Sequence, residues 1–199
     1  MQSFAIVTGI AASLPASNVD TDVIMPKQFL KGVDRSGLRD GVFHDLRFGT
    51  SKADFVLNRN PWREARFLVV GPNFGCGSSR EHAVWGLGQF GIRALIGTSF
   101  AGIFFDNCAH NGLLAITLEP DQIETLTAVV SNPASAELTI DLPNQTITAP
   151  SGLRIAFDIE SGRKESLVLG LDAVGTTLQA REAIKQFERG YLRENPWLA

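Results

Sequence analysis

The segment of the chain with the clearest chemical potential is Gly71-Pro-Asn-Phe-Gly-Cys-Gly-Ser-Ser-Arg-Glu-His82. Its glycines allow a ligand to approach the backbone closely. Arg80 offers a planar fork of N–H donors that suits a carboxylate or a phosphate, and the hydroxyls of Ser78 and Ser79 can bind the same group. The segment therefore predicts a site for a small anion.

The neighbouring sequence indicates how this segment is held. Residues 67–70 form a short apolar run, which predicts a buried strand. Ser78 followed by Glu81 has the spacing of a helix N-terminus and predicts a helix over residues 78–90. The first N–H groups of a helix are unpaired and carry a partial positive charge, so we expect the anion to bind where the loop meets this helix.

The motif favours a carboxylate over a nucleotide. No Gly-Lys-Ser/Thr follows the glycines, and Arg80 stands where a dinucleotide fingerprint would have its third glycine. A simpler interpretation is that Ser78 and Ser79 only cap a helix while Arg80 forms a surface ion pair.

Four other residues nearby are weaker candidates. Cys76 could be a nucleophile, because a helix N-terminus favours the thiolate, and His82 could serve it as a base; a small buried thiol is the simpler interpretation. Asp20 and Asp22 fall on one side of an extended segment and could form a carboxylate pair or a metal site. Acids in turns more often accept hydrogen bonds from local backbone N–H groups.

The pattern of elements predicts an α/β fold. Strands and helices alternate over residues 66–130, which is typical of a parallel sheet. A first strand at 4–10 precedes this unit, and the segment around Pro143-Asn144 predicts a hairpin with additional β structure after it. The expected strands are 67–70, 94–96, 113–118, 137–142, 145–149 and 153–159, and the expected helices are 78–90, 100–110 and 120–130.

The length of 199 residues is that of a single domain, 1–199. Residues 31–60 are polar with weak periodicity, and we expect them to form a mobile loop. Residues 161–199 are expected to form a helical C-terminal tail, with the clearest helical pattern at 178–189.

Composition excludes several classes of protein. The net charge of −3 argues against a nucleic-acid partner. Residues 1–19 carry no charge, but a buried first strand is the simpler interpretation, and the other uncharged runs, 67–79 and 94–105, fall short of the ~20 apolar residues of a membrane span. The two cysteines, Cys76 and Cys108, provide neither a disulfide framework nor a zinc pair, and this chain alone should carry no iron–sulfur cluster. His44 and His110 are isolated, so no metal ligands are expected, and a reducing cytoplasm fits best.

Four segments together resemble the small subunit of 3-isopropylmalate dehydratase (isopropylmalate isomerase), the detached swivel domain of the aconitase superfamily. They are Asn18-Val-Asp-Thr-Asp-Val-Ile-Met-Pro-Lys-Gln-Phe-Leu30, Phe74-Gly-Cys-Gly-Ser-Ser-Arg-Glu-His82, residues 107–114 and the tail 171–198. The resemblance covers nearly the whole chain. It implies a swivelling β/β/α domain similar to aconitase domain 4.

The resemblance also implies a function. The chain would be part of a hydro-lyase that is active only with a large subunit carrying a [4Fe–4S] cluster. The reaction would convert 2-isopropylmalate to 3-isopropylmalate, by loss and re-addition of water, in leucine biosynthesis. Small subunits of related dehydratases, which act on 2-methylmalate, dimethylmalate or homoaconitate-type acids, remain alternatives.

The resemblance assigns roles to residues of this chain. Ser78 would be the base that removes a proton from carbon. Ser79 and Arg80 would bind a substrate carboxylate and steady the charge, which makes Arg80 a catalytic residue together with Ser78. In the loop after Pro26, Phe29 and Leu30 would receive the isopropyl group. Lys31 would attract a further carboxylate, or would simply be solvated.

Two other functions stay open on the residues alone. One is a carboxylate-binding module that does no chemistry. The other is a stand-alone cysteine-dependent hydrolase, for which Cys76 would be essential.

Overall fold

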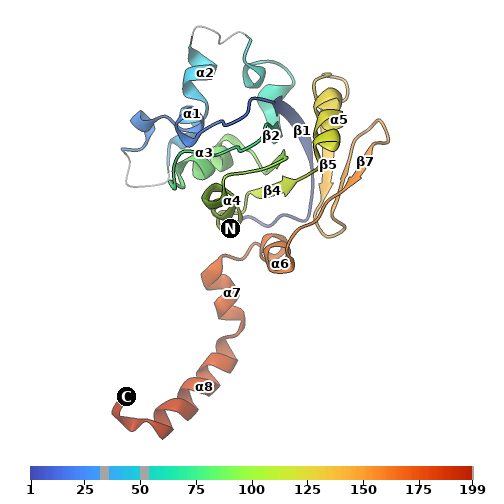
Figure 1. The fold of residues 1–199 in the computed structure, drawn as a ribbon. Coiled ribbons are helices and arrows are strands. Elements are labelled where there is room, and N and C mark those ends of the chain that lie inside the picture. The colour runs from blue at the N-terminus through green and yellow to red at the C-terminus, as the bar shows by residue number, and fades with distance from the viewer. Residues whose placement is uncertain (32–35, 50–53, 199) are drawn as a thin grey trace.

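The computed structural model describes residues 1–31, 36–49 and 54–198. A seven-stranded sheet in the order β4-β3-β2-β1-β5-β6-β7 forms its centre (Figure 1). Neighbours from β1 to β4 run parallel, whereas β5, β6 and β7 extend the sheet antiparallel from β1. The strands are β1 (Ile6–Leu14), β2 (Ala65–Val70), β3 (Ala94–Gly97), β4 (Leu114–Thr117), β5 (Glu137–Asp141), β6 (Thr146–Thr148) and β7 (Arg154–Ala156). The predicted parallel unit with additional β structure is confirmed.

Helices cover the sheet and form the C-terminal tail. They are α1 (Thr21–Ile24), α2 (His44–Phe48), α3 (His82–Phe90), α4 (Gly102–His110), α5 (Pro120–Val130), α6 (Ser161–Leu169), α7 (Ala173–Gln179) and α8 (Arg181–Glu194). Short 3₁₀ turns lie at Lys27–Phe29, Leu38–Gly41, Val56–Asn58, Trp62–Glu64 and Pro196–Leu198. None of the helices among the described residues is long and apolar enough to cross a membrane.

Both faces of β2 are buried, which explains its uninterrupted apolar sequence. Successive side chains of a strand point to opposite faces. Phe67 and Val69 pack in the cluster that includes α5, whereas Leu68 and Val70 pack in the cluster that includes α3. The sheet is therefore the middle layer of the fold. The apolar side chains of α3 pack in the same cluster as those of β2, the strand that leads into the glycine loop.

Two helix starts differ from those expected. α4 begins at Gly102 instead of residue 100, because Ala101 has an extended backbone and is the N-cap, without a side-chain capping bond. The Ser99 hydroxyl, a possible cap for the expected helix, instead accepts a hydrogen bond from the backbone N–H of Asn73 (2.9 Å). α3 begins at His82 instead of Ser78, for a reason given with the site below.

The segment 31–60 is more regular than its sequence suggests. Its described parts include two 3₁₀ turns and α2, because Leu38, Val42 and Phe43 are buried in the core. Residues 32–35 and 50–53, on which the expectation of a mobile loop also depends, lie outside the described residues.

The C-terminal tail is helical, as expected, and it projects from the body of the fold. α7 and α8 extend away from the sheet in Figure 1. Their large apolar side chains are exposed, with Phe187 at 69% and Trp197, just after α8, at 75%. Such exposure is unusual for aromatic side chains and is typical of surfaces that take part in interactions.

Candidate functional site

The candidate site lies beyond the carboxyl ends of β1 and β2, which are adjacent parallel strands. The chain leaving β1 leads to α1, and the chain leaving β2 forms the glycine loop of residues 71–77. Ligand sites of parallel sheets gather at this edge, because several chain segments turn there side by side.

Backbone hydrogen bonds tie the glycine loop to the start of α1. The N–H of Gly75 donates to the carbonyl of Val19 (2.8 Å), and the N–H of Thr21 donates to the carbonyl of Cys76 (2.9 Å). Gly75 has a φ of 80°, and a Cβ atom there would lie 2.2 Å from Cγ of Phe104. Only glycine satisfies both the backbone conformation and the packing.

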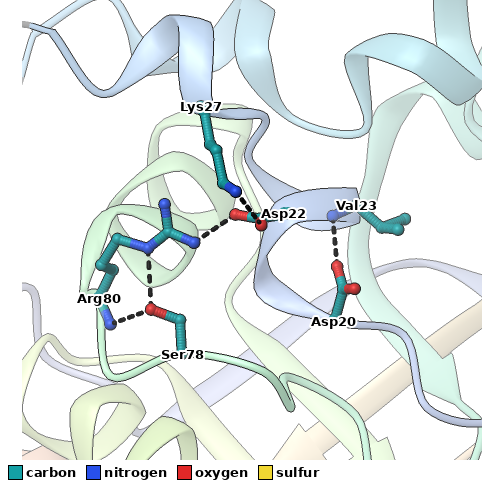
Figure 2. A network of polar contacts seen from close by, with 6 residues as sticks. All are labelled: Asp20, Asp22, Val23, Lys27, Ser78 and Arg80. Atoms are coloured by element: carbon teal, nitrogen blue, oxygen red, sulfur yellow. Dashed lines mark hydrogen bonds and ion pairs between the residues drawn. The ribbon is translucent and has the colours of Figure 1, made fainter.

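Arg80 donates two hydrogen bonds to the hydroxyl oxygen of Ser78. Its Nε lies 2.8 Å and its backbone nitrogen 3.3 Å from Ser78 Oγ (Figure 2). That oxygen is therefore not available to cap a helix. α3 instead begins at His82 after Glu81, without a side-chain capping bond. The predicted start of this helix at Ser78 is wrong, and the serine instead belongs to a loop that presents it beside Arg80.

The same guanidinium also binds Asp22. Arg80 Nη2 donates to Asp22 Oδ1, and Lys27 Nζ lies 3.5 Å from Asp22 Oδ2 (Figure 2). Burial acts to raise the pKa of the Asp22 carboxyl, but the hydrogen bonds and charges of Arg80 and Lys27 outweigh it and hold that pKa below its usual value. Two cations around one carboxylate leave a formal charge of +1 on the three side chains, which favours an added anion.

Asp20 has a different role from Asp22. Its Oδ1 accepts a hydrogen bond from the N–H of Val23 (2.7 Å), which makes Asp20 the N-cap of α1. Of the two interpretations of this acidic pair, local backbone bonding is confirmed for Asp20. Among residues 1–31, 36–49 and 54–198, no cluster of three or more His, Cys, Asp or Glu side chains could hold a metal ion.

Two amide side chains, one in α4 and one directly after it, hold the backbone at Ser79 through a chain of hydrogen bonds. Asn107 Nδ2 donates to the carbonyl of Ser79 (3.2 Å), and Asn111 Nδ2 donates to the carbonyl of Asn107 (2.8 Å). Trp85 of α3 in turn donates its Nε1–H to Asn111 Oδ1 (2.9 Å). This network fixes the backbone of Ser79 while its side chain stays exposed.

Ser78 and Arg80 are half-buried, so both remain reachable from solvent. Phe29 and Leu30 are also half-buried and pack against the core, with the ring of Phe29 centred 4.9 Å from that of His44. Lys31 is exposed. The lysine that the structure joins to the Ser78–Arg80–Asp22 group is Lys27, which the sequence analysis did not single out.

The remaining candidates behave as packed side chains. The Cys76 thiol donates to the carbonyl of Asn18 (3.4 Å). The His82 ring lies on that of Trp85, with 4.7 Å between centroids, and its Nδ1 is buried without a hydrogen-bond partner among the described residues. Cys108 is fully buried, and burial raises the pKa of its thiol far above the usual range. Nothing in this arrangement favours a cysteine nucleophile.

Comparison with protein families assigns matches to most of the chain. The aconitase C-terminal domain family matches residues 1–121, and a family described as LeuD_N matches residues 124–161. The C-terminal domain of the 3-isopropylmalate dehydratase small subunit matches residues 174–199. The candidate site lies within the first of these matches, and the projecting tail corresponds to the third.

Individual relatives are similar over their full length. The 3-isopropylmalate dehydratase small subunit 1 of Mannheimia succiniciproducens is 57% identical, covering 100% of this chain and 99% of the relative. The small subunit of Rhodospirillum rubrum is 50% identical, with 100% and 97% coverage. The crystal structure of 3-isopropylmalate dehydratase from Methanocaldococcus jannaschii is 28% identical, with a TM-score of 0.67 over 92% of this chain and 99% of that one. Both the sequence and the fold are thus shared with these proteins.

Proposed function

Because this chain belongs to the family of 3-isopropylmalate dehydratase small subunits, we propose that its Ser78–Arg80–Asp22 group is one half of a dehydratase active site. The chain is the small subunit of a hydro-lyase that converts 2-isopropylmalate to 3-isopropylmalate in leucine biosynthesis, and a small subunit requires a larger partner. The observation that supports the role of this group is the pair of hydrogen bonds from Arg80 to Ser78 Oγ.

Ser78 is proposed to be the base that removes a proton from the substrate carbon. The two Arg80 donors stabilise negative charge on Ser78 Oγ once its own proton has left. Lowering the pKa of a hydroxyl from that of water to a value near neutrality requires roughly 10 kcal/mol. A charge-assisted hydrogen bond contributes about 1.5–3 kcal/mol, so these donors alone are insufficient. We infer that Ser78 becomes reactive only in a closed, dry site that the large subunit completes.

Arg80 is proposed to bind the substrate carboxylate as well. Its Nε and Nη2 already serve Ser78 and Asp22, and Asp22 thereby fixes the orientation of the guanidinium. The remaining N–H donors, together with the exposed hydroxyl of Ser79, are suited to a carboxylate. The net positive charge of the Asp22, Lys27 and Arg80 side chains supports this assignment.

The side chains of this chain do not fit a [4Fe–4S] cluster. Such clusters usually take four thiolates, whereas Cys108 is sealed in the core and Cys76 is bonded to a backbone carbonyl. We propose that the cluster belongs to the large subunit, where it would supply Lewis-acid chemistry. Both cysteines here are free thiols, which fits our proposed location in a reducing cytoplasm.

Phe29, Leu30 and Lys31 remain our proposed specificity residues. The half-buried Phe29 and Leu30 present apolar surface that suits an isopropyl group, and the exposed Lys31 offers a positive charge. Their position two to four residues after Lys27, which contacts Asp22, supports this proposal. An assay against 2-isopropylmalate, 2-methylmalate, dimethylmalate and homoaconitate tests it. Preference for 2-methylmalate would contradict an apolar pocket of isopropyl size, and preference for homoaconitate would favour the role of Lys31 over that of Phe29 and Leu30.

The tail is proposed to be a contact for the large subunit. Ile184, Phe187 and Tyr191 recur at helical spacing on α8 and are exposed, and the rings of Phe187 and Tyr191 stack with centroids 5.6 Å apart. The family that matches residues 174–199 is defined on the small subunit of this dehydratase, which supports the choice of partner. Covering this apolar face would stabilise the assembly.

Substitution of Ser78 in the reconstituted complex tests the proposed function. Ser78→Ala should lower kcat by about 10²–10⁴-fold, the usual contribution of a general base, and leave assembly unchanged. Cys76→Ala is the matched control in the same loop and should retain most of the rate. Full activity of Ser78→Ala would refute the proposal, and loss of activity only in Cys76→Ala would favour a cysteine nucleophile.

A further inference from the structure

We propose that the chain carries a second anion-binding site, formed by four arginines around one hollow at the opposite end of α3 from Arg80. This hollow, here called the arginine pocket, has a volume of about 380 Å³. Its charged lining residues are Arg39, Arg63, Arg66, Arg93 and Glu64. The inference goes beyond the proposed function, because the arginine pocket contains none of the residues assigned to the dehydratase site.

Arg93 is the residue that points most directly to a ligand. It is only 9% exposed, although it carries a full positive charge. Its Nη2 donates to the carbonyl of Ser3 (2.7 Å), and its guanidinium lies 5.3 Å from the centre of the Phe4 ring. These contacts hold the side chain in place without neutralising it. A buried cation without a counter-ion is costly, and an anion in the arginine pocket would relieve that cost.

The neighbouring arginines reinforce this imbalance of charge. In the part of the chain that the structure describes, no carboxylate oxygen lies within 4.0 Å of a nitrogen of Arg39, Arg66 or Arg93. Burial lowers the pKa of Arg93, and the positive charge of Arg66 lowers it further. The two guanidiniums therefore repel each other, and a bound anion would reduce that repulsion.

The other three arginines of the lining are held by contacts that leave part of each guanidinium free to bind an anion. Arg66 Nη1 donates to the carbonyl of Thr8 (3.0 Å), and Arg39 lies over the ring of Phe90 at 5.7 Å. Arg63 pairs with Glu64 (3.4 Å), and both of these side chains are exposed. Four arginines and one glutamate give the lining a formal charge of +3.

The ligand class that fits is a small oxyanion with two or more negative charges. Guanidinium forks match the oxygens of phosphate and carboxylate groups equally well in geometry. The volume is in the range of small-ligand sites. A Cβ atom at Gly88 or at Gly91 would meet no other atom within 4 Å, so the glycine side of the pocket is open. A concave site with a buried arginine suits a compact anion better than a protein surface.

Isothermal titration calorimetry on the full chain tests the proposal, with inorganic phosphate, diphosphate and malate as separate probes. We expect one arginine-pocket site per chain and affinity that falls as salt is added. Tighter binding of diphosphate than of malate would assign the site to phosphate compounds, and the reverse order would assign it to dicarboxylates. Because each of these anions can also bind at Arg80, every titration is repeated with Arg80→Gln.

Variants identify the site of binding. The double substitution Arg39→Gln/Arg66→Gln removes two exposed guanidiniums and should weaken binding of the preferred anion at least about tenfold. Arg93→Lys keeps the charge but loses the planar fork, and it should weaken binding if circular dichroism shows that it still folds. Arg154→Gln, an exposed arginine on β7, is the control and should bind normally. Absence of saturable binding at millimolar concentrations, or equal affinity in the double variant and the control, would overturn the proposal.

Discussion

The Nε of Arg80 lies 2.8 Å from the Oγ of Ser78, while Nη2 of the same guanidinium binds Asp22 (Figure 2). One rigid cation therefore links the proposed base to a carboxylate from another segment of the chain. Because a guanidinium is planar, the contact with Asp22 sets the direction in which Arg80 Nε points toward Ser78. The orientation of the Arg80–Ser78 pair thus depends on α1 as well as on the glycine loop.

Arg80→Lys separates the charge of Arg80 from its geometry. Lysine keeps a positive charge but lacks the Nε donor and the fork, so it cannot hold Ser78 and Asp22 together. We expect kcat of the reconstituted dehydratase to fall about 10²–10³-fold, as when one donor to a developing oxyanion is removed. Steady-state kinetics on the purified complex measures the change. Arg154→Lys is the control, and a rate equal to that control would exclude the proposed role of the Arg80 hydrogen bonds.

The pKa of Asp22 provides a test that needs no activity. The carboxyl has a lowered pKa because Arg80 and Lys27 outweigh the effect of burial. A ¹³C NMR titration of the isolated chain should show Asp22 titrating below the ordinary value of about 3.9. In Lys27→Gln the pKa should rise, and in Arg80→Lys, where the bond to Arg80 Nη2 is lost, it should also rise. An unchanged midpoint in both variants would mean that these contacts do not form in solution.

The same shift predicts the sign of a dependence of stability on pH. A carboxyl whose pKa is lower in the folded chain stabilises the fold above its unfolded pKa, and this contribution is lost as pH falls through the folded value. Asp22→Asn should therefore make the free energy of unfolding fall less steeply below about pH 4. Urea unfolding at several acidic pH values measures the slope. The Asp22 side chain is 41% exposed, so the effect is expected to be small.

Local patterns in the sequence were sufficient for the parallel unit and for some helix boundaries. Pro120 begins α5 as expected, and Glu119 and Gln122 form the reciprocal capping box that stabilises this start. The spacing of Ser78 and Glu81 resembles such a box equally well, yet Ser78 Oγ accepts its hydrogen bonds from Arg80. A side chain with several possible partners is assigned correctly only when all of its neighbours in space are known.

Part of the proposed site could be predicted from the sequence. The glycine loop and Arg80 follow from residue types, because close backbone approach and anion binding require those types. The contact between Asp22 and Arg80 joins two segments that meet only through the pairing of β1 and β2, and no local periodicity encodes it. Lys27 was not predicted for the same reason. Its place five residues after Asp22 was the one signal in the sequence that could have suggested an ion pair between the two side chains.

Gly75→Ala and Gly152→Ala separate backbone strain from crowding. Both glycines have positive φ, 80° and 87°, but a Cβ at Gly75 would lie 2.2 Å from Phe104, and one at Gly152 meets nothing within 4 Å. The strain alone costs about 1–2 kcal/mol, and overpacking adds about 1–3 kcal/mol. We therefore expect the free energy of unfolding, measured with urea, to fall further for Gly75→Ala. Equal losses would show that Phe104 moves aside without cost.

The tail offers a test of assembly that leaves the catalytic group untouched. Phe187→Ser removes an aromatic side chain that is 69% exposed on α8, so the stability of the isolated chain should change little. If the large subunit covers this face, the loss of about 1.5–3 kcal/mol of apolar burial should weaken assembly about tenfold or more. Glu188→Ser on the same helix is the matched control. Analytical ultracentrifugation of mixed subunits measures the dissociation constant.

Self-association is the alternative that this experiment must separate from docking to the large subunit. If α8 faces a second copy of the chain, the isolated wild-type protein will be a dimer, and Phe187→Ser will convert it to a monomer while mixed assembly keeps its affinity. If α8 faces the large subunit, the isolated chain will show no dependence on Phe187, and only the mixed complex will weaken. The second pattern is the one we expect, because residues 174–199 match a domain defined on the small subunit of a two-component enzyme.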